Sequence, residues 1–251
     1  MNHLAVFARW PEPGRVKTRL SPALPAALAC DLYRALLADA LAAAAACPAD
    51  ARSLHWAGAP AGHAPGATPA GFEVRDQRGA DLGERLEHAT GELLRVRGAR
   101  AVIIGADCPD LDATRIAAGF TALERAELVL GPAHDGGYYL IGLTRPVPTL
   151  FRGLDWGTSR VLAQTRERAR TLDLSMTELE PLGDLDTPAD LARWAARAAV
   201  SGAAEGAGAT GGSRTRAALR ALGLMPDAEP GSHARASQGR VAAAHPRRSA
   251  V

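Results

Sequence analysis

The chain has 251 residues, of which 47% are hydrophobic and 22% charged, and its formal net charge is +2. From Ser201 onward it carries seven arginines against three acids, so this part has a charge of +4 and the rest has −2. A body of that charge excludes a basic nucleic-acid binder, and no uninterrupted apolar stretch is long enough to span a membrane.

The hydrophobic pattern predicts strands and helices that alternate along the chain. The first half is predicted to contain strands at 4–8, 53–57, 72–75 and 101–106, helices at 24–46 and 82–97, and a loop at 58–71. The second half is predicted to contain helices at 113–125, 159–170 and 188–200 and strands at 128–131, 138–143 and 176–179.

Strands separated by helices favour a mainly parallel sheet with right-handed crossovers. The close pair of strands around Asp135 indicates one antiparallel member. Residues 1–200 are therefore expected to form one α/β domain. From residue 201 the composition changes to Gly, Ala, Ser, Arg and Pro, so 201–251 is predicted to be a disordered tail, in which 214–224 is compatible with one short helix.

The three cysteines, Cys30, Cys47 and Cys108, have neither CxxC nor metal-ligand spacing. This pattern favours a reduced, cytoplasmic chain without a disulfide framework. The N-terminus shows no basic segment, apolar core or cleavage site typical of a signal peptide.

Asp107 follows the apolar run 101–106 and precedes Pro109. Such a run is typical of a strand buried on both faces, and the carboxyl end of that strand is where open α/β sheets bind ligands. A carboxylate at this place could hold a divalent metal against a phosphate. The alternative role, an N-cap for the next helix, suits Asp112 better. Cys108 has no recognisable histidine partner, so we interpret it as a core residue.

The loop between the first strand and the first helix is rich in cations. Arg9, Arg15, Lys17 and Arg19 can bind phosphate, and Gly14 allows a ligand to approach the backbone closely. The loop lacks the GxxxxGK[ST] pattern. The alternative interpretation is a solvated basic loop, but its place at the carboxyl end of a strand favours nucleotide binding.

Residues 131–143 carry a glycine pair between two strands. Gly136 and Gly137 permit positive φ and close ligand approach, and His134, Asp135 and Tyr138 flank them. An ordinary hairpin turn remains the alternative, because Asp-Gly is a strong turn signal.

Residues 183–191 place two acids just before a helix. Thr187, Pro188 and Asp190 fit the N-cap, the first helical position and the first turn. Asp184 and Asp186 have no such role and would point the same way in a strand-like segment. A second carboxylate meeting Asp107 would complete a metal site.

Taken together, these segments resemble a bacterial family in the GT-A, or nucleotide-diphospho-sugar transferase, superfamily. Its members are glycosyltransferases, some linked to arsenosugar biosynthesis. The resemblance covers about 3–199. It rests on FARWPEPGRVKTRL at 7–20, DLGERL at 81–86, GADCPDL at 105–111, GPAHDGGYYLIGL at 131–143, GLDWGTSRVL at 153–162 and GDLDTPADL at 183–191. Arg9 stands where related chains usually have lysine, which keeps the charge.

The resemblance implies a three-layer α/β/α, Rossmann-like fold with a mixed, mainly parallel sheet, and a metal, Mg²⁺ or Mn²⁺, held by Asp107 and Asp186. Asp107, Lys17 and Asp135 become the candidate catalytic residues, with Asp135 as the base. The expected nucleotide-binding residues are Ala8, Arg9, Pro13, Gly14, Arg15, Lys17 and Arg19. The expected residues for the small-molecule acceptor are His134, Gly136, Gly137, Tyr138, Asp155 and Trp156.

Two enzymatic interpretations and one non-enzymatic interpretation follow. The first is transfer of a sugar from a nucleotide sugar to the acceptor. The second is transfer of a nucleotidyl group from an NTP to a phosphorylated small molecule with release of pyrophosphate. It is considered because GRVKTRL also looks like the loop of the guanylyltransferases of deazaflavin-cofactor biosynthesis and resembles molybdenum-cofactor nucleotidyltransferases. The third is a nucleotide-binding regulator without turnover, which an intact pair of Asp107 and Asp186 disfavours. The sequence leaves the oligomeric state open.

Overall fold

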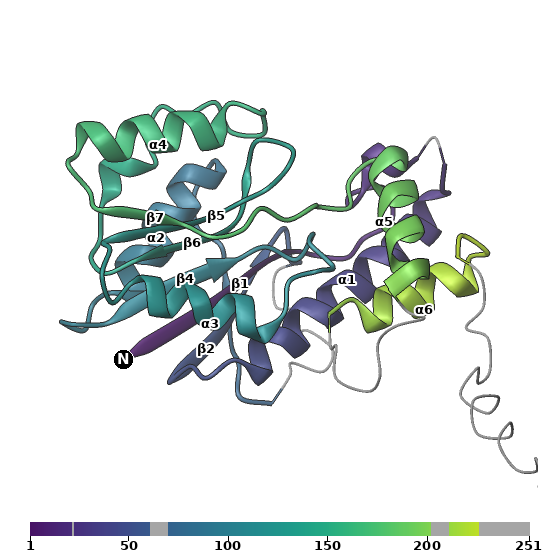
Figure 1. The fold of residues 1–251 in the computed structure, drawn as a ribbon, viewed down its shortest axis with the longest axis horizontal. Coiled ribbons are helices and arrows are strands. Elements are labelled where there is room, and N and C mark those ends of the chain that lie inside the picture. The colour runs from purple at the N-terminus through teal and green to yellow at the C-terminus, as the bar shows by residue number, and fades with distance from the viewer. Residues whose placement is uncertain (22, 61–69, 202–210, 226–251) are drawn as a thin grey trace, which may run out of the picture.

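The computed structural model describes residues 1–21, 23–60, 70–201 and 211–225. Their elements, shown in Figure 1, are β1 (Asn2–Arg9), η1 (Thr18–Leu20), α1 (Ala26–Ala46), β2 (Ala51–Ala57), β3 (Glu73–Asp76), α2 (Leu82–Leu93), β4 (Arg100–Ile104), α3 (Ala113–Ala122), β5 (Leu128–Pro132), β6 (Tyr138–Leu143), η2 (Pro148–Leu150), α4 (Val161–Thr171), β7 (Met176–Glu178), α5 (Pro188–Ser201) and α6 (Ser213–Ala221).

The seven strands form one sheet in the order β3-β2-β1-β4-β6-β5-β7. Every neighbouring pair is parallel except those that involve β6, which runs antiparallel to β4 and β5. The mixed, mainly parallel α/β sheet and its single antiparallel member are therefore confirmed. Most of the predicted elements end within two or three residues of the observed ones.

Helices cover both faces of the sheet. Leu4 and Val6 of β1 lie in a core cluster with residues of α1 and α3, whereas Ala5 lies in a second cluster with residues of α2 and α4. This alternation follows from the two-residue side-chain period of a strand. The result is the expected three-layer arrangement.

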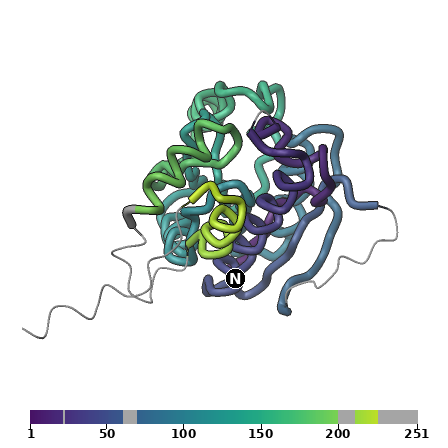
Figure 2. The backbone as a smooth tube through the Cα atoms, turned by 90° about the vertical axis from the view of Figure 1, so that its right-hand side faces the viewer, coloured from purple at the N-terminus to yellow at the C-terminus, as the bar shows by residue number. Residues whose placement is uncertain are grey.

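A third core cluster lies beyond the sheet, where α1, α5 and α6 meet. Leu36 of α1, Trp194 of α5 and Leu219 of α6 are all buried in it, together with Leu20 of η1 and Leu185. Figure 2 shows α5 and α6 beside α1 on this side of the molecule.

Helix α6 departs from the predicted tail. Its N-terminus is capped from α1, because the buried carboxylate of Asp39 accepts hydrogen bonds from Arg214 N at 3.0 Å and from Thr215 N and Oγ1, both at 2.8 Å. Residues 211–225 are thus part of the folded domain, close to the short helix compatible with 214–224. The remainder of the predicted tail and most of the predicted loop at 58–71 lie outside the described residues.

No helix among these described segments is long and apolar enough to cross a membrane. The three cysteines are free and buried. Cys108 is a core residue as expected, and burial raises the pKa of its thiol well above the usual value.

His55 on β2 makes stability depend on pH. Its side chain is 2% exposed and its Nε2 lies 2.9 Å from Ser53 Oγ. Burial, reinforced by Arg75, lowers its pKa from 6.5 to about 4. As the pH falls from 6.5 to about 4, the unfolded chain takes up a proton that the folded chain does not, so the stability present above pH 6.5 decreases by up to about 3 kcal/mol.

We therefore expect the free energy of unfolding in urea to be about 2 kcal/mol lower at pH 5 than at pH 7.5, beyond any change in a His55→Gln control. Glutamine can still hydrogen-bond Ser53 but does not titrate. Parallel losses in the two proteins would show that His55 is not the cause.

Candidate active site

A cavity of about 390 Å³ lies at the carboxyl ends of the parallel strands β1, β2 and β4. Parallel strands bring their carboxyl ends to one edge of the sheet, so the loops that follow them meet there. The cavity is lined by Phe7, Ala8, Arg9, Arg15, Val16, Lys17, Thr18, Arg19, Tyr33, Ala57, Gln77, Leu82, Arg85, Gly105, Asp107, Tyr138 and Asp186.

Lys17 joins the two acids of this cavity. Its Nζ lies 2.6 Å from Asp107 Oδ1 and 2.5 Å from Asp186 Oδ1, and its side chain is only 3% exposed. Burial lowers the pKa of Lys17, but attraction to Asp107 and Asp186 outweighs burial, so the net pKa lies above its usual value. The ammonium is therefore charged at neutral pH and ties together three segments that are distant in sequence.

The loop that carries Lys17 has an unusual backbone. Lys17 has φ +50° and Gly14 has φ +80°. The left-handed conformation costs an ordinary residue about 1–2 kcal/mol, and we attribute its retention at Lys17 to the two ion pairs. A Cβ on Gly14 would meet nothing within 4 Å, so its glycine is required by the backbone angle and the space in front of it is open.

Local hydrogen bonds leave Asp186 available to Lys17. At the start of α5, Asp190 Oδ2 accepts from Thr187 N at 2.7 Å, and Asp190 N donates to Thr187 Oγ1 at 3.2 Å. This pair is the predicted helix cap. Next to it, Leu185 N donates to Asp107 O at 2.9 Å, which brings the two acidic loops together.

Cations form the rim of the cavity. The side chains of Arg15 and Arg19 are 71% and 66% exposed, and Arg19 Nη1 is 4.0 Å from Asp186 Oδ2. The backbone of Arg9 is fixed by Tyr33, whose hydroxyl accepts from Arg9 N at 2.8 Å and donates to Arg9 O at 3.2 Å. Arg15 and Arg19 are exposed enough to turn toward an anion. Pro13, like Gly14, belongs to the same loop but does not line the cavity.

Asp107 and Asp186 each direct one oxygen at a common point, which Lys17 Nζ occupies. Carboxylate oxygens are suitable ligands for Mg²⁺ and Mn²⁺. Over the described part of the chain, no group of three or more His, Cys, Asp or Glu side chains could hold a metal ion. The pair thus fits a cation that phosphate oxygens also bind, which is the usual situation of Mg²⁺.

A smaller cavity of about 110 Å³ contains His134 and Asp135, together with Asp184, Asp190 and Arg193 among others. Burial raises the pKa of Asp184 to about 6, and repulsion from Asp135 and Asp186 adds to it. Asp184 therefore lies near acids of both cavities. Residues 183–186 do not form a strand, so the condition under which Asp184 and Asp186 would point the same way is not met, and Asp186 lines the main cavity while Asp184 lines the smaller one.

The glycine pair at 136–137 shapes the loop between these cavities. Gly136 has φ +90°, and a Cβ there would lie 2.2 Å from Ser159 O, so no other residue fits. Gly137 N donates to Asp135 Oδ1 at 2.8 Å, a turn interaction that also orients the carboxylate. The structure brings neither glycine into the cavity of Lys17.

Of the remaining acceptor candidates, only Tyr138 reaches the main cavity. The ring of Trp156 meets the ring of Tyr138 edge-on, with centroids 6.4 Å apart. Trp156 also closes against α2, where a Cβ on Gly83 would lie 2.5 Å from its Nε1. Asp155 binds Gln164 Nε2 at 2.5 Å and Arg160 Nη2 at 3.1 Å, so its carboxylate is already paired.

The main cavity contains nine residues that sequence reasoning did not select, and four of them come from α1, from the end of β3 and from α2. Tyr33 comes from α1, Gln77 follows β3, and Leu82 and Arg85 belong to the first turn of α2. Gln77 stands directly after the observed β3, the kind of position that identified Asp107, whereas the strand predicted from the sequence ended at Arg75. Leu82 and Arg85 lie in the DLGERL segment, to which no role was given.

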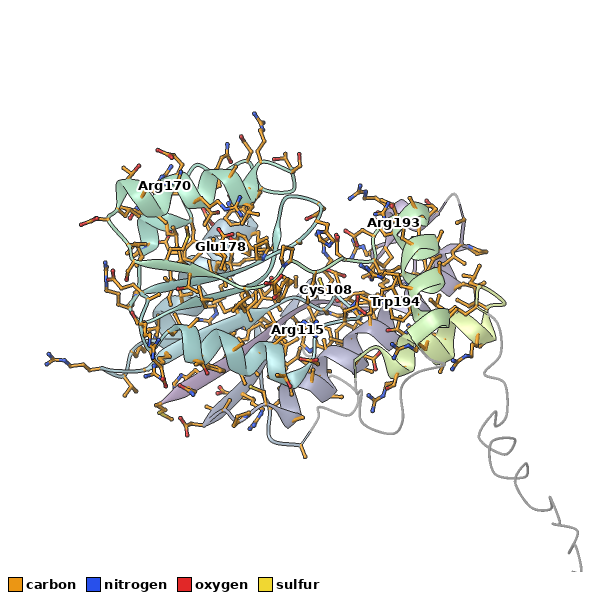
Figure 3. All side chains as sticks on the ribbon, viewed as in Figure 1. Cys108, Arg115, Arg170, Glu178, Arg193 and Trp194 are labelled. Atoms are coloured by element: carbon orange, nitrogen blue, oxygen red, sulfur yellow. The ribbon has the colours of Figure 1, made fainter. Side chains whose placement is uncertain are left out.

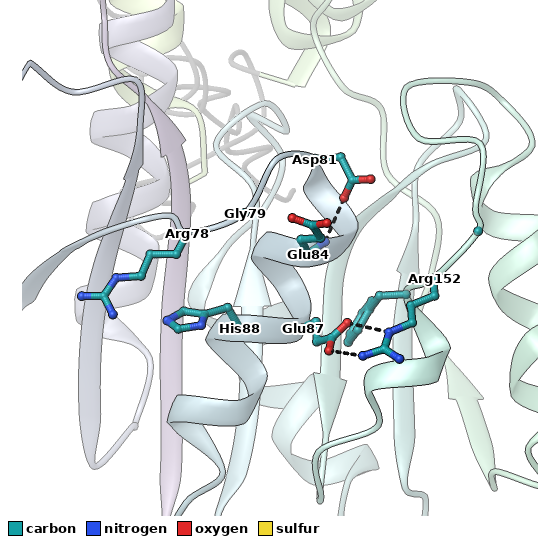
Figure 4. Close-up of a pocket in the computed structure, with 9 residues that line it drawn as sticks. Arg78, Gly79, Asp81, Glu84, Glu87, His88 and Arg152 are labelled. Atoms are coloured by element: carbon teal, nitrogen blue, oxygen red, sulfur yellow. Dashed lines mark hydrogen bonds and ion pairs between the residues drawn. The ribbon is translucent and has the colours of Figure 1, made fainter.

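A wider hollow of about 660 Å³ lies between α2 and 151–153 (Figure 4), and it contains none of the predicted site residues. Several of its charged groups are already paired: Arg152 binds Glu87 with contacts of 2.6 and 3.1 Å, and Asp81 caps Glu84 N. The charged groups around Lys17 therefore make the cavity of about 390 Å³ the better candidate for the active site.

Comparisons with known proteins bear on the fold. Residues 37–158 match the model of a family described as "Uncharacterized protein conserved in bacteria (DUF2064)". No curated protein matches the chain.

Among solved structures, the chain is similar to a protein from Desulfovibrio desulfuricans G20 that is assigned, by inference, as a nucleotide-diphospho-sugar transferase. The two are 28% identical with a TM-score of 0.76, over 90% of this chain and 99% of that one. The homolog of Mycobacterium tuberculosis Rv0371c from Mycobacterium sp. strain JC1 is 18% identical with a TM-score of 0.50, over 78% and 96%. The resemblance found in the sequence and the expected fold class are therefore confirmed.

Proposed function

We propose that this chain, which has the fold of the nucleotide-diphospho-sugar transferases, transfers a sugar from a nucleotide sugar to the hydroxyl of a small-molecule acceptor. The observation that carries the proposal is the Lys17 ammonium between Asp107 and Asp186, in a cavity at the carboxyl ends of the strands. An ammonium has three N–H donors, and two are used by the carboxylates. The third remains for a phosphate oxygen.

In the proposed reaction, the bond between the sugar carbon and the diphosphate oxygen breaks, and a bond from the acceptor oxygen to that carbon forms. The nucleoside diphosphate leaves with the electron pair, and Lys17 and Arg15 donate hydrogen bonds to it. Asp107 and Asp186 would hold Mg²⁺ or Mn²⁺ in competition with the Lys17 ammonium at their facing oxygens, and the metal when bound would supply positive charge against the leaving diphosphate. Asp135 would take the acceptor's proton.

The acceptor is proposed to enter from the side of His134 and Asp135. Asp184 lines the smaller cavity, and repulsion from both Asp135 and Asp186 adds to the rise of its pKa, which supports an arrangement in which the acids of the two cavities lie near one another. Tyr138 lines the main cavity and contacts Trp156, so these rings would border the sugar. Gly136, Gly137 and Asp155 would shape this side without touching the phosphates.

Nucleotidyl transfer is the second candidate. The cations around the loop, namely Lys17 and the exposed Arg15 and Arg19, would also suit a triphosphate. The products distinguish the two reactions, because sugar transfer releases a nucleoside diphosphate and nucleotidyl transfer releases pyrophosphate.

The first test is thermal stabilisation by nucleoside triphosphates, diphosphates and nucleotide sugars, with and without Mn²⁺. A ligand that binds only the folded chain raises its stability with affinity and concentration. A Mn²⁺-dependent shift that is larger for a nucleotide sugar than for the matching NTP supports sugar transfer. A shift confined to an NTP favours nucleotidyl transfer, and no shift with any nucleotide contradicts both.

Asp107→Asn is expected to abolish the Mn²⁺-dependent part of that stabilisation and to lower turnover by at least about 100-fold, because a neutral amide no longer balances the cation. Asp31→Asn, an exposed change on α1, is the control and should behave like the wild-type protein. Retention of metal-dependent binding in Asp107→Asn would show that Asp107 is not a ligand.

A further inference from the structure

Gln77 has a side chain whose orientation is fixed by the sheet. Its Nε2 donates to Ala8 O of β1 at 3.2 Å and to His55 O of β2 at 3.0 Å. Its backbone N donates to Trp56 O at 2.8 Å. Two carbonyl acceptors require the NH₂ side of the amide, so the assignment of its nitrogen and oxygen follows from chemistry.

The amide oxygen of Gln77 therefore remains available to accept a hydrogen bond from a ligand. Both N–H donors of the side chain are used on backbone carbonyls, and no donor within the described segments bonds to Oε1. Gln77 is only partly buried and lines the cavity that contains Lys17 and Asp107. Gln77 thus contributes a fixed acceptor of its own to this cavity, in addition to the carboxylates of Asp107 and Asp186.

The position of Gln77 suits the far end of a nucleotide. In the order β3-β2-β1-β4, three strand spacings separate the end of β3 from the end of β4, where Asp107 follows. At about 4.8 Å per spacing this is roughly 14 Å across the sheet. A nucleotide whose phosphates meet Lys17 would place its base on the side of Gln77.

Two side chains of helix α2, one apolar and one a hydrogen-bond donor, lie on the side of Gln77. Leu82 is 41% exposed although it lines the cavity, which offers an apolar surface to a flat ring. Arg85 donates from Nε to Gly79 O at 3.1 Å, so its two terminal nitrogens remain as donors. A ring that lies on Leu82 would find an acceptor in Gln77 and a donor in Arg85.

We propose that Gln77 and Arg85 read the lactam edge of a nucleobase, the adjacent N–H and C=O that guanine and uracil carry. Gln77 Oε1 accepts from the ring N–H, and the Arg85 guanidinium donates to the carbonyl oxygen, an acceptor that arginine commonly reads in guanine. Glutamine recognises adenine by using both its oxygen and its nitrogen, and the nitrogen of Gln77 is already used. This inference rests on the proposed function, because it assigns the base of the same nucleotide.

The test measures binding of GDP, UDP, ADP and CDP by calorimetry in the presence of Mn²⁺, with pyrophosphate as a ligand that has no base. We expect the wild-type protein to bind GDP or UDP at least about tenfold more tightly than ADP and CDP. Gln77→Met keeps the length of the side chain but removes the acceptor, so the preference should shrink to less than about threefold while pyrophosphate affinity stays unchanged.

A second measurement needs no variant, in case loss of the two backbone contacts disturbs the fold. N1-methyl-GDP and N3-methyl-UDP lack the N–H donor, and each should bind the wild-type protein at least about tenfold more weakly than its parent. Equal affinity of methylated and parent nucleotides would overturn the role of Gln77.

The remaining outcomes are also decisive. Preference for ADP or CDP overturns the lactam assignment, and equal binding of all four nucleotides overturns base recognition while leaving the proposed function intact. Absence of binding by every nucleotide and by pyrophosphate would overturn both.

Discussion

Lys17→Met is expected to bind Mn²⁺ in the absence of nucleotide at least about tenfold more tightly than the wild-type protein, and to bind nucleoside diphosphates about 100-fold more weakly. The two changes have opposite signs because the positive charge of Lys17 favours phosphate binding and disfavours metal binding. Its ammonium attracts phosphates, but it also occupies the point at which Asp107 and Asp186 converge.

The gain in metal affinity follows from charge. Both carboxylates make contacts of 2.6 Å or less with one ammonium, so a cation that binds their facing oxygens must compete with it. Methionine is of similar length but neutral, and it leaves two carboxylates without their buried partner. Asp107 is 49% exposed, so water screens part of the effect, and this sets the modest size of the expected gain.

Mn²⁺ binding is measured by electron paramagnetic resonance of the free ion, and nucleotide binding by calorimetry. Arg19→Met is the control, because its guanidinium is 66% exposed and 4.0 Å from Asp186, so Mn²⁺ affinity should change less than about threefold. Unchanged Mn²⁺ affinity in Lys17→Met would refute the two-carboxylate cation site. Unchanged nucleotide affinity in Lys17→Met would show that the loop containing Lys17 does not bind the nucleotide.

A chain that ends at Ser201 is expected to lose about 5 kcal/mol of unfolding free energy relative to a chain that ends at Met225. The shorter chain lacks Leu219 and Met225, which are 0% and 6% exposed in the third core cluster. Full burial of such side chains contributes about 1.5–3 kcal/mol each. The buried Asp39 would also lose its donors on α6, which adds the cost of an unsatisfied carboxylate.

Urea unfolding of the two chains measures the difference, and the chain ending at Met225 is the matched control because it keeps every described contact of α6. Asp39→Asn in the longer chain should cause an intermediate loss of about 1–3 kcal/mol, since the amide can satisfy fewer of these donors. Equal stability of the two truncated chains would show that α6 contributes nothing to the fold.

The sequence predicted the order of helices and strands well because each apolar pattern reports a local period. A short helix was compatible with 214–224, but its place in the folded domain was not predicted, because the stability of α6 comes from distant residues. Asp39 caps it from α1. Trp194, which Figure 3 labels, belongs to α5 and lies near the start of α6, because a Cβ on Gly212 would lie 2.9 Å from its indole ring. The local sequence of α6, rich in Ala and Arg, does not reveal that Asp39 and Trp194 contact this helix.

For the candidate site, too, the sequence identified individual residues but not their arrangement in space. Asp107, Lys17 and Asp186 could be selected because each stands beside a strand end or a helix cap, positions that a sequence reveals. That Lys17 lies between the two acids could not be predicted, because it depends on a left-handed backbone at Lys17 and on loops 169 residues apart. Gln77 was missed because its amide matters only through carbonyls of two other strands.

The two outermost strands of the sheet have a consequence for self-association. β3 has four residues, with Glu73, Arg75 and Asp76 among them, and β7 has three, with Glu178 paired to Arg166. Short, charged edge strands resist pairing with the sheet of another molecule and so protect against aggregation. Two copies of this protein would therefore meet through helices or loops, and not by extending one sheet into the next.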